Sequence, residues 1–309
     1  MPPASRTESR SRSSSGQPMR RLLHRPTGTL WHHPDFLRLW TGQTISEMGT
    51  QISQLAIPLL AAVELNASPI AFSLLAVFGF LPFILFALPA GVWVDRLRRR
   101  QILIVCDAAR VVLLGLIPVL WAVGVLEMWQ LLVLEFLIGI FTVFFDVAYQ
   151  SYLPALIERE QLMEGNSKLQ LTVSITQVAG PGVSGGLIAA VTAPYAIAAD
   201  AISYVFSTAF MLRMRHREDI PERTADEPRP QMWPELKEGV RWVVGHPWLR
   251  AIAACTGSSN FFFQIIMAVL VLYAVRSLHL SAAEIGIIFA VGSLGAVVGA
   301  LVADRKSVV

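Results

Sequence analysis

The stretch IAFSLLAVFGFLPFILFALPAGVWVDRLRRR, residues 70–100, decides the fold class of this chain. Its first part, 70–94, carries no charged side chain, and its last part carries Arg96, Arg98, Arg99 and Arg100. A helix rises about 1.5 Å per residue, so about 20 apolar residues cross a hydrocarbon core about 30 Å thick. Unpaired backbone amides are costly in that medium, which favours a helix over loops or open strands. The stretch therefore predicts a membrane-spanning helix that ends at a basic loop.

Seven further apolar stretches have a similar length, and together they predict eight membrane-spanning helices. The predicted spans are 39–63, 70–94, 102–125, 129–149, 171–191, 195–212, 252–273 and 285–302. The composition agrees, because 54% of the residues are hydrophobic and only 15% are charged, against about 25% charged in a soluble domain. The predicted fold class is an all-α membrane protein.

Lysine and arginine are distributed unevenly over the connections between the predicted spans. The connections after the second, fourth and sixth spans carry them, whereas those after the first, third and fifth carry none. Because basic residues prefer the cytoplasmic side of a membrane, the basic connections and the N-terminus are expected in the cytoplasm. Arg276, after the seventh span, is the exception expected outside. This pattern predicts a multi-pass protein of the plasma membrane.

The remaining composition excludes other classes of protein. Residues 1–34 are rich in Ser, Arg and Pro and contain no signal-peptide-like apolar run, which predicts a disordered cytoplasmic tail. The net charge of +3 gives no reason to invoke nucleic acid. Cys106 and Cys255 are too few for a disulfide framework or a metal site and are expected to be small core residues. We expect no metal and no cofactor.

Polar side chains inside a predicted span require an explanation, since each costs a few kcal/mol or more at mid-bilayer. The first span has the densest set, with Gln43, Glu47, Gln51 and Gln54 at helical spacing on one face. This face is predicted to line an aqueous cavity, and the alternative is that it hydrogen-bonds neighbouring helices. Gln43 and Gln51 are therefore candidates for the lining of a substrate cavity. Glu47, an intramembrane carboxylate, is a candidate for proton coupling.

The third span carries opposite charges, Asp107 and Arg110, three residues apart on one face. Pairing lowers the cost of placing both in the membrane. The two residues are further candidates for proton coupling, and a static ion pair between helices is an equal alternative. Lone polar groups in later spans are expected to make hydrogen bonds between helices; they are Glu135, Asp146, Tyr149, Asp200, Ser203 and Asn260. Asp200 and Asn260 are also candidates for the cavity lining.

The segment GVWVDRLRRR at 91–100 resembles the cytoplasmic signature of the major facilitator superfamily, Gly-x-x-x-Asp-Arg-x-Gly-Arg-Arg, which lies between the second and third spans of that family. Arg98 stands where the family usually has glycine. Other runs are similar to the branch that includes the enterobactin exporter and macrolide-efflux proteins: FLRLW at 36–40, GQTIS at 42–46, YLPAL at 152–156 and LKEGVRW at 236–242. The run GPGVSGG at 180–186 resembles an antiporter signature, and Gly182 and Gly186 within it are predicted to pack against another helix.

The resemblance implies a fold and a gate. The family is built from two six-helix halves with substrate near the midplane, so 35–213 would be the N-terminal half and 214–250 a cytoplasmic connector, amphipathic from Trp233 onward. Residues 251–309 would be the first two helices of an incomplete C-terminal half. The signature implies a cytoplasmic gate built from Gly91, Asp95, Arg96 and Arg99, with Asp146 as a carboxylate partner. The alternative for the arginines is that they only anchor the topology.

The end of the sequence departs from the family pattern. Asp304 and Arg305 fall where the second half would repeat the basic signature, and the match stops there. Residues 304–309 are also one reading frame of a common sequencing adapter. We therefore expect a C-terminally truncated record of a longer chain.

The function that the resemblance implies is proton-coupled export of a small organic molecule, such as a drug, a macrolide or a siderophore, by a monomer that works through alternating access. The alternatives are a non-transporting scaffold or an inactive fragment. A channel is less favoured because only the first span is strongly polar. The motifs of metalloproteases, serine hydrolases and P-loop ATPases are absent from the sequence, which disfavours an enzyme and ATP-driven transport.

Overall fold

The computed structural model describes residues 29–94, 96–214 and 232–306. Within them the chain is helical and has no strand, as the sequence predicts. The long helices are α1 (Pro34–Leu59), α2 (Pro69–Val94), α3 (Arg99–Ala122), α4 (Met128–Leu156), α5 (Leu162–Val191), α6 (Ala193–Leu212), α7 (Met232–Gly245), α8 (Pro247–Arg276) and α9 (Ala282–Lys306). Three short helical turns accompany them: η1 (Thr29–His32) precedes α1, η2 (Leu60–Glu64) follows α1, and η3 (Arg159–Gln161) precedes α5.

Each of the eight predicted spans falls on a long helix, but only six helices in the described residues are long and apolar enough to cross a membrane. These six are α2, α3, α4, α5 together with η3, α6 and α8. Helix α1 is long enough, but its polar face lowers its mean hydropathy. The apolar part of α9 in the described residues, Ala282–Gly295, is shorter. The chain is therefore a multi-pass membrane protein whose first long helix is unusually polar.

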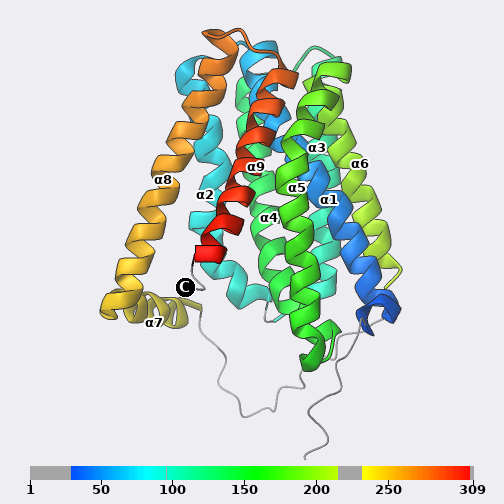
Figure 1. Ribbon diagram of the computed structural model, residues 1–309, viewed down its shortest axis with the longest axis vertical. Helices are drawn as coiled ribbons and strands as arrows, with labels where there is room; N and C mark the ends of the chain where they lie inside the picture. Colours follow the sequence, from blue (N-terminus) through cyan, green and yellow to red (C-terminus); the bar gives the residue numbers. More distant parts are fainter. Residues whose placement is uncertain (1–28, 95, 215–231, 307–309) are drawn as a thin grey trace, which may run out of the picture.

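The helices run side by side as a bundle, with α7 lying across its base beside the start of α8 (Figure 1). Helix α1 packs against α5 and α6, α2 against α4, and α3 against α4 and α6. Helix α9 packs along α5, and α8 contacts α2 (Figure 1). We call the end at which α2 ends and α3 begins the basic end, after Arg96, Arg98, Arg99 and Arg100. The other end, at which α8 ends and α9 begins, is the opposite end.

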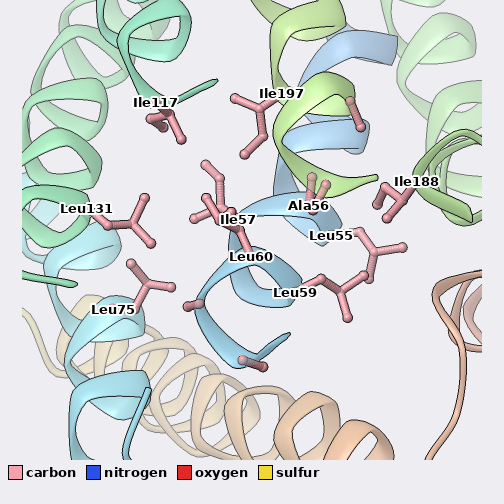
Figure 2. Packing of buried hydrophobic residues seen from close by; sticks show 14 of the residues in the cluster. Leu55, Ala56, Ile57, Leu59, Leu60, Leu75, Ile117, Leu131, Ile188 and Ile197 are labelled. Atoms are coloured by element: carbon pink, nitrogen blue, oxygen red, sulfur yellow. The ribbon is translucent and has the colours of Figure 1, made fainter. Parts of the chain in front are cut away.

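An apolar cluster closes the bundle at the opposite end, and we call it the apolar plug (Figure 2). It joins the last turns of α1, α3 and α5 to the first turns of α2, α4 and α6, and it includes α8 and α9. Its buried residues include Leu55, Ile57, Leu60, Leu75, Ile117, Leu131, Ile188, Ile197, Val271, Ala274 and Ile285. Side chains from eight helices thus meet at this end.

A second apolar cluster lies at the basic end and has a different membership. Its buried residues come from η1, α1, α2, α3, α4, α6 and the connections of these helices, and no described residue of α8 is among them. The side chains of 251–266 on α8 are exposed. In the described residues, α8 therefore closes against the other helices toward the opposite end.

Some local expectations differ from the structure. Residues 29–34, assigned to a disordered tail, form η1 and the start of α1, because Leu30 is fully buried and the Trp31 ring packs edge-on against Trp40 at 5.4 Å. The rest of that tail lies outside the described residues. Cys106 is buried as predicted, whereas Cys255 is exposed because it lies on the uncovered part of α8. Helix α7 covers the segment predicted to be amphipathic.

The glycine-rich run of α5 packs against α9, but through a different glycine from those predicted. A Cβ added to Gly185 would lie 2.8 Å from the Cα of Gly286, whereas a Cβ on Gly186 would meet nothing within 4 Å. On Gly182 it would make only an ordinary contact with Ala290 at 3.6 Å. Close approach of α5 and α9 therefore requires glycine at 185 and 286, one residue away from the predicted face.

Candidate functional site

A cavity of about 730 Å³ lies inside the bundle, next to the apolar plug. Its wall is formed mainly by α1, α2 and α4, with contributions from α3, α5, α6, α8 and α9. Among the described residues that line it, Arg110 is the single Lys or Arg, and the acids are Glu47, Glu135, Asp146 and Asp200. The volume is within the range of about 300–1,000 Å³ that small-molecule sites occupy.

Helix α1 presents its polar face to this cavity. Gln43, Glu47, Gln51 and Gln54 all line the wall, together with the hydroxyls of Ser46, Thr50 and Ser53. Their spacing of three to four residues places them on one side of the helix, and the apolar Leu55 and Ile57 of the same helix are buried in the plug. The structure thus places the predicted α1 candidates together.

Asp107 and Arg110 form a buried ion pair on α3. The Nη2 of Arg110 lies 2.5 Å from the Oδ1 of Asp107, and the side chains are 5% and 0% exposed. The other carboxylate oxygen of Asp107 accepts a hydrogen bond of 2.6 Å from the Ser207 hydroxyl on α6. The two charges therefore compensate each other inside the bundle, and the pair ties α3 to α6.

Arg110 also extends the network toward α1 and α4. Its guanidinium carbon lies 4.3 Å from the ring centroids of both Phe145 and Tyr204, a cation–π geometry on two faces. Its Nη1 donates to the Tyr204 hydroxyl at 3.1 Å, and that hydroxyl shares a hydrogen bond of 2.8 Å with Thr50. Because an arginine side chain stays charged, this arrangement fixes one positive charge at the wall of the cavity.

Asp200 links α6 to α1. Its carboxylate accepts hydrogen bonds from Ser53 at 2.5 Å and from Ser203 at 3.1 Å. Gly49 makes this approach possible, since a Cβ at that position would overlap the Asp200 carboxylate and the Ser203 hydroxyl. Sequence reasoning did not assign a role to Gly49, because only the facing helix shows why a side chain is excluded there.

Asp146 lies in the cavity rather than at the predicted gate. In the described residues it makes no ion pair with Arg96 or Arg99, and the charge of Arg110 acts on it instead. The charge of Arg110 also acts on Glu47 and on Asp200. The sequence had placed Asp146 near the cytoplasmic loop, but its side chain points from α4 toward the polar face of α1.

The predicted gate itself is described only in part. Asp95 lies outside the described residues. Arg96 is exposed and Arg99 is half-buried. A Cβ added to Gly91 would meet nothing within 4 Å, so this arrangement of the helices does not by itself require glycine there.

Two further polar residues differ from expectation. Asn260 is exposed, and its Nδ2 donates to the Thr256 carbonyl oxygen at 2.9 Å. It lies one turn nearer the basic end than Gln264, which does line the cavity. Glu135, expected to hydrogen-bond another helix, lines the cavity, and its Oε2 is buried with no hydrogen-bond partner in the described residues. The sequence marked Glu135 only as a carboxylate inside a span, and its place in the cavity depends on how α4 packs.

Comparison with known proteins identifies related chains. The family described as "Transmembrane secretion effector" matches residues 30–307. The chain is 26% identical to an uncharacterised MFS-type transporter, YfiS, of Bacillus subtilis (strain 168), over 69% of this chain and 50% of that protein. It is 28% identical to macrolide efflux protein A of Streptococcus pyogenes, over 56% and 42% of the two chains. It is 28% identical to the enterobactin exporter EntS of Salmonella typhimurium, over 70% and 50%.

A solved structure shares the fold. A bacterial homologue of the human lysosomal transporter Spinster, in an inward-facing and unoccupied conformation, superposes with a TM-score of 0.62 at 14% sequence identity. The match covers 88% of this chain and 62% of that one. At this identity the likeness shows the fold alone.

The chain spans about half the length of the curated relatives it matches. Those relatives are transporters rather than enzymes, which agrees with the prediction from sequence. The match to the family model covers nearly all of the described helices. The chain therefore belongs to the transmembrane secretion effector family of the major facilitator superfamily.

Proposed function

We propose that this protein is a proton-coupled secondary active exporter of a small organic molecule and that it works by alternating access. The observation that carries the proposal is the cavity, in which Glu47, Asp146 and Asp200 lie near one fixed arginine beside the apolar plug. The family supports transport as the general activity. Export is supported by two relatives whose names state efflux of macrolides and export of enterobactin.

Alternating access is supported by the unequal closure of the two ends. The apolar plug joins α8 and α9 to the other helices at the opposite end, whereas the cluster at the basic end contains no described residue of α8. In the alternate state we expect the plug to separate and α8 to close at the basic end. The gate at that end would be formed by Gly91, Asp95, Arg96 and Arg99.

Proton coupling is supported by the charge balance of the cavity. Asp107 already neutralises Arg110, and Glu47, Asp146 and Asp200 lie within the influence of the same arginine. Burying several carboxylates beside one cation is costly unless some of the charge is removed. A proton on Glu47 or Asp146 removes one negative charge, and its release to the other side would couple proton movement to export.

The orientation follows from the distribution of arginines. We propose that the basic end and the N-terminus face the cytoplasm of a plasma membrane. Exposed apolar side chains such as Ile84, Leu85 and Leu88 on α2 would then contact lipid. We propose that the protein acts as a monomer, since the cavity is lined by helices of one chain.

Proton coupling can be tested in proteoliposomes that hold the intact gene product and a pH-sensitive dye. Addition of an exported compound should change the internal pH in the wild type. We expect Glu47→Gln and Asp107→Asn to abolish the proton signal, whereas Glu158→Gln, an exposed carboxylate at the basic end, should preserve it. Unchanged proton movement in both cavity variants would place coupling elsewhere.

A further inference from the structure

We propose that Glu135 forms a recognition site for an organic cation with an apolar body, at a place in the cavity separate from the Arg110 network. This inference rests on the proposed function in one respect, that the cavity is where the substrate binds. It adds the charge of the substrate and the residue that selects for it.

Glu135 lies on α4 and faces α2 at Gly79. A Cβ added to Gly79 would lie 3.0 Å from the Oε1 of Glu135, so the missing side chain makes room for the carboxylate. Neither oxygen of Glu135 takes part in a hydrogen bond or an ion pair with any described residue, and Oε2 is completely buried. The carboxylate thus occupies space left by the absent side chain of Gly79 and has no polar partner among the described residues.

Glu135 also differs from the other acids of the cavity in its electrostatic surroundings. The charge of Arg110 acts on Glu47, Asp107, Asp146 and Asp200. No neighbouring cation in the described residues acts on Glu135. A buried, charged carboxylate without a partner is energetically unfavourable. Binding of a proton or a cation to Glu135 would remove this cost.

The wall around the cavity favours an organic cation over a proton alone. Helix α2 contributes Phe72, Phe80 and Phe83, and the rings of Phe80 and Phe83 stack with centroids 6.1 Å apart. Phe263 of α8 and Phe289 of α9 line the same space. Aromatic faces attract cations and contact apolar groups. A proton needs neither, whereas a bulky amine or a phosphonium ion uses the carboxylate and the rings together.

The test measures binding to the purified intact protein in lipid nanodiscs, with no gradient applied. The probes are tetraphenylphosphonium, a permanent cation, and tetraphenylborate, an anion of nearly the same shape. We expect saturable binding of the cation and little binding of the anion. Glu135→Gln should weaken binding of the cation about thirtyfold or more, since it removes one partner of a buried charge pair. The matched control, Glu158→Gln, should bind as the wild type does.

Glu135→Asp provides a second variant, which keeps the charge and withdraws it by one methylene. It should bind the cation more weakly than the wild type and more tightly than Glu135→Gln. If Glu135→Gln does not fold, the comparison of Glu135→Asp with the wild type tests the proposal. Equal affinity of the wild type and both variants for the cation would overturn the proposal, as would equal binding of the two probes or an absence of saturable binding. Cation binding through Glu135 in a protein that exports nothing would contradict the proposed function alone.

Discussion

Arg276, in the last turn of α8, donates a hydrogen bond from its guanidinium to the carbonyl oxygen of Ala67, just before α2. The two residues lie at the opposite end of the bundle, where Ala67 is buried in the apolar plug. Arg276 was the exception to the distribution of basic residues in the sequence. The structure gives it a role in holding α8 against the start of α2.

Replacement of Arg276 should loosen closure at the opposite end. A hydrogen bond from a charged donor contributes about 1.5–3 kcal/mol, so Arg276→Ala should shift the conformational equilibrium by about tenfold or more toward an open plug. The measurement is the labelling rate of Leu60→Cys, at a position fully buried in the plug, by a membrane-impermeant maleimide, in a background where Cys106 and Cys255 are replaced by serine. Arg241→Ala, in α7 at the other end, is the matched control. The same labelling rate in all three proteins would mean that Arg276 does not hold the plug closed.

Gly49 should tolerate no side chain. Gly49→Ala would push a methyl group into Asp200 and Ser203 and separate α1 from α6, with a cost of about 1–3 kcal/mol for overpacking. Gly115→Ala is the control, because a Cβ there meets nothing within 4 Å in the middle of α3. The melting temperature in detergent should fall for the first variant only. Equal melting temperatures would show that α1 and α6 are less tightly packed than described.

The Asp107–Arg110 pair should behave as a unit. Asp107→Asn alone leaves the Arg110 guanidinium buried without its counter-charge, which costs about 3–5 kcal/mol. The double variant Asp107→Asn with Arg110→Gln removes both charges and should be less destabilised than the single variant. A double-mutant cycle on melting temperature, read at constant detergent, measures this coupling. Strictly additive effects would argue against a paired interaction in the folded protein.

The basic signature should be needed for movement rather than for folding. We expect Asp95→Ala to reach the membrane and to bind substrate while losing export, as the family signature implies. Glu158→Gln, an exposed carboxylate at the same end and outside the signature, serves as the control. Insertion is checked by surface labelling, binding by equilibrium titration and export by efflux from cells. Normal efflux by Asp95→Ala would remove the gating role from the signature.

The helical bundle could be predicted from the sequence because each span is defined by its own run of apolar residues and by the charges that flank it. The polar face of α1 could be predicted for the same reason: Gln43, Glu47 and Gln51 recur at the period of a helix. Asp107 and Arg110 are three residues apart, so their pairing also needed no knowledge of other helices.

The positions of Asp146, Glu135 and Asn260 depend on how helices pack, and the sequence of one helix does not record that. Asp146 lines the cavity, where the charge of Arg110 on α3 acts on it, Glu135 fits against Gly79 of α2, and Asn260 lies one turn beyond the cavity. The glycines show the same limit. Gly49 and Gly185 are required by contacts with α6 and α9, whereas Gly186, the more obvious packing candidate, has open space.

The most direct test of the central claim is accumulation of candidate substrates in cells that produce the intact gene product, across a panel of macrolides, siderophores and organic cations. If the cavity around Glu47 and Arg110 carries substrate, at least one compound should accumulate less than in cells without the protein, and a protonophore or Arg110→Ala should restore its accumulation. Equal accumulation of every compound, with the protein correctly inserted in the membrane, would contradict the account.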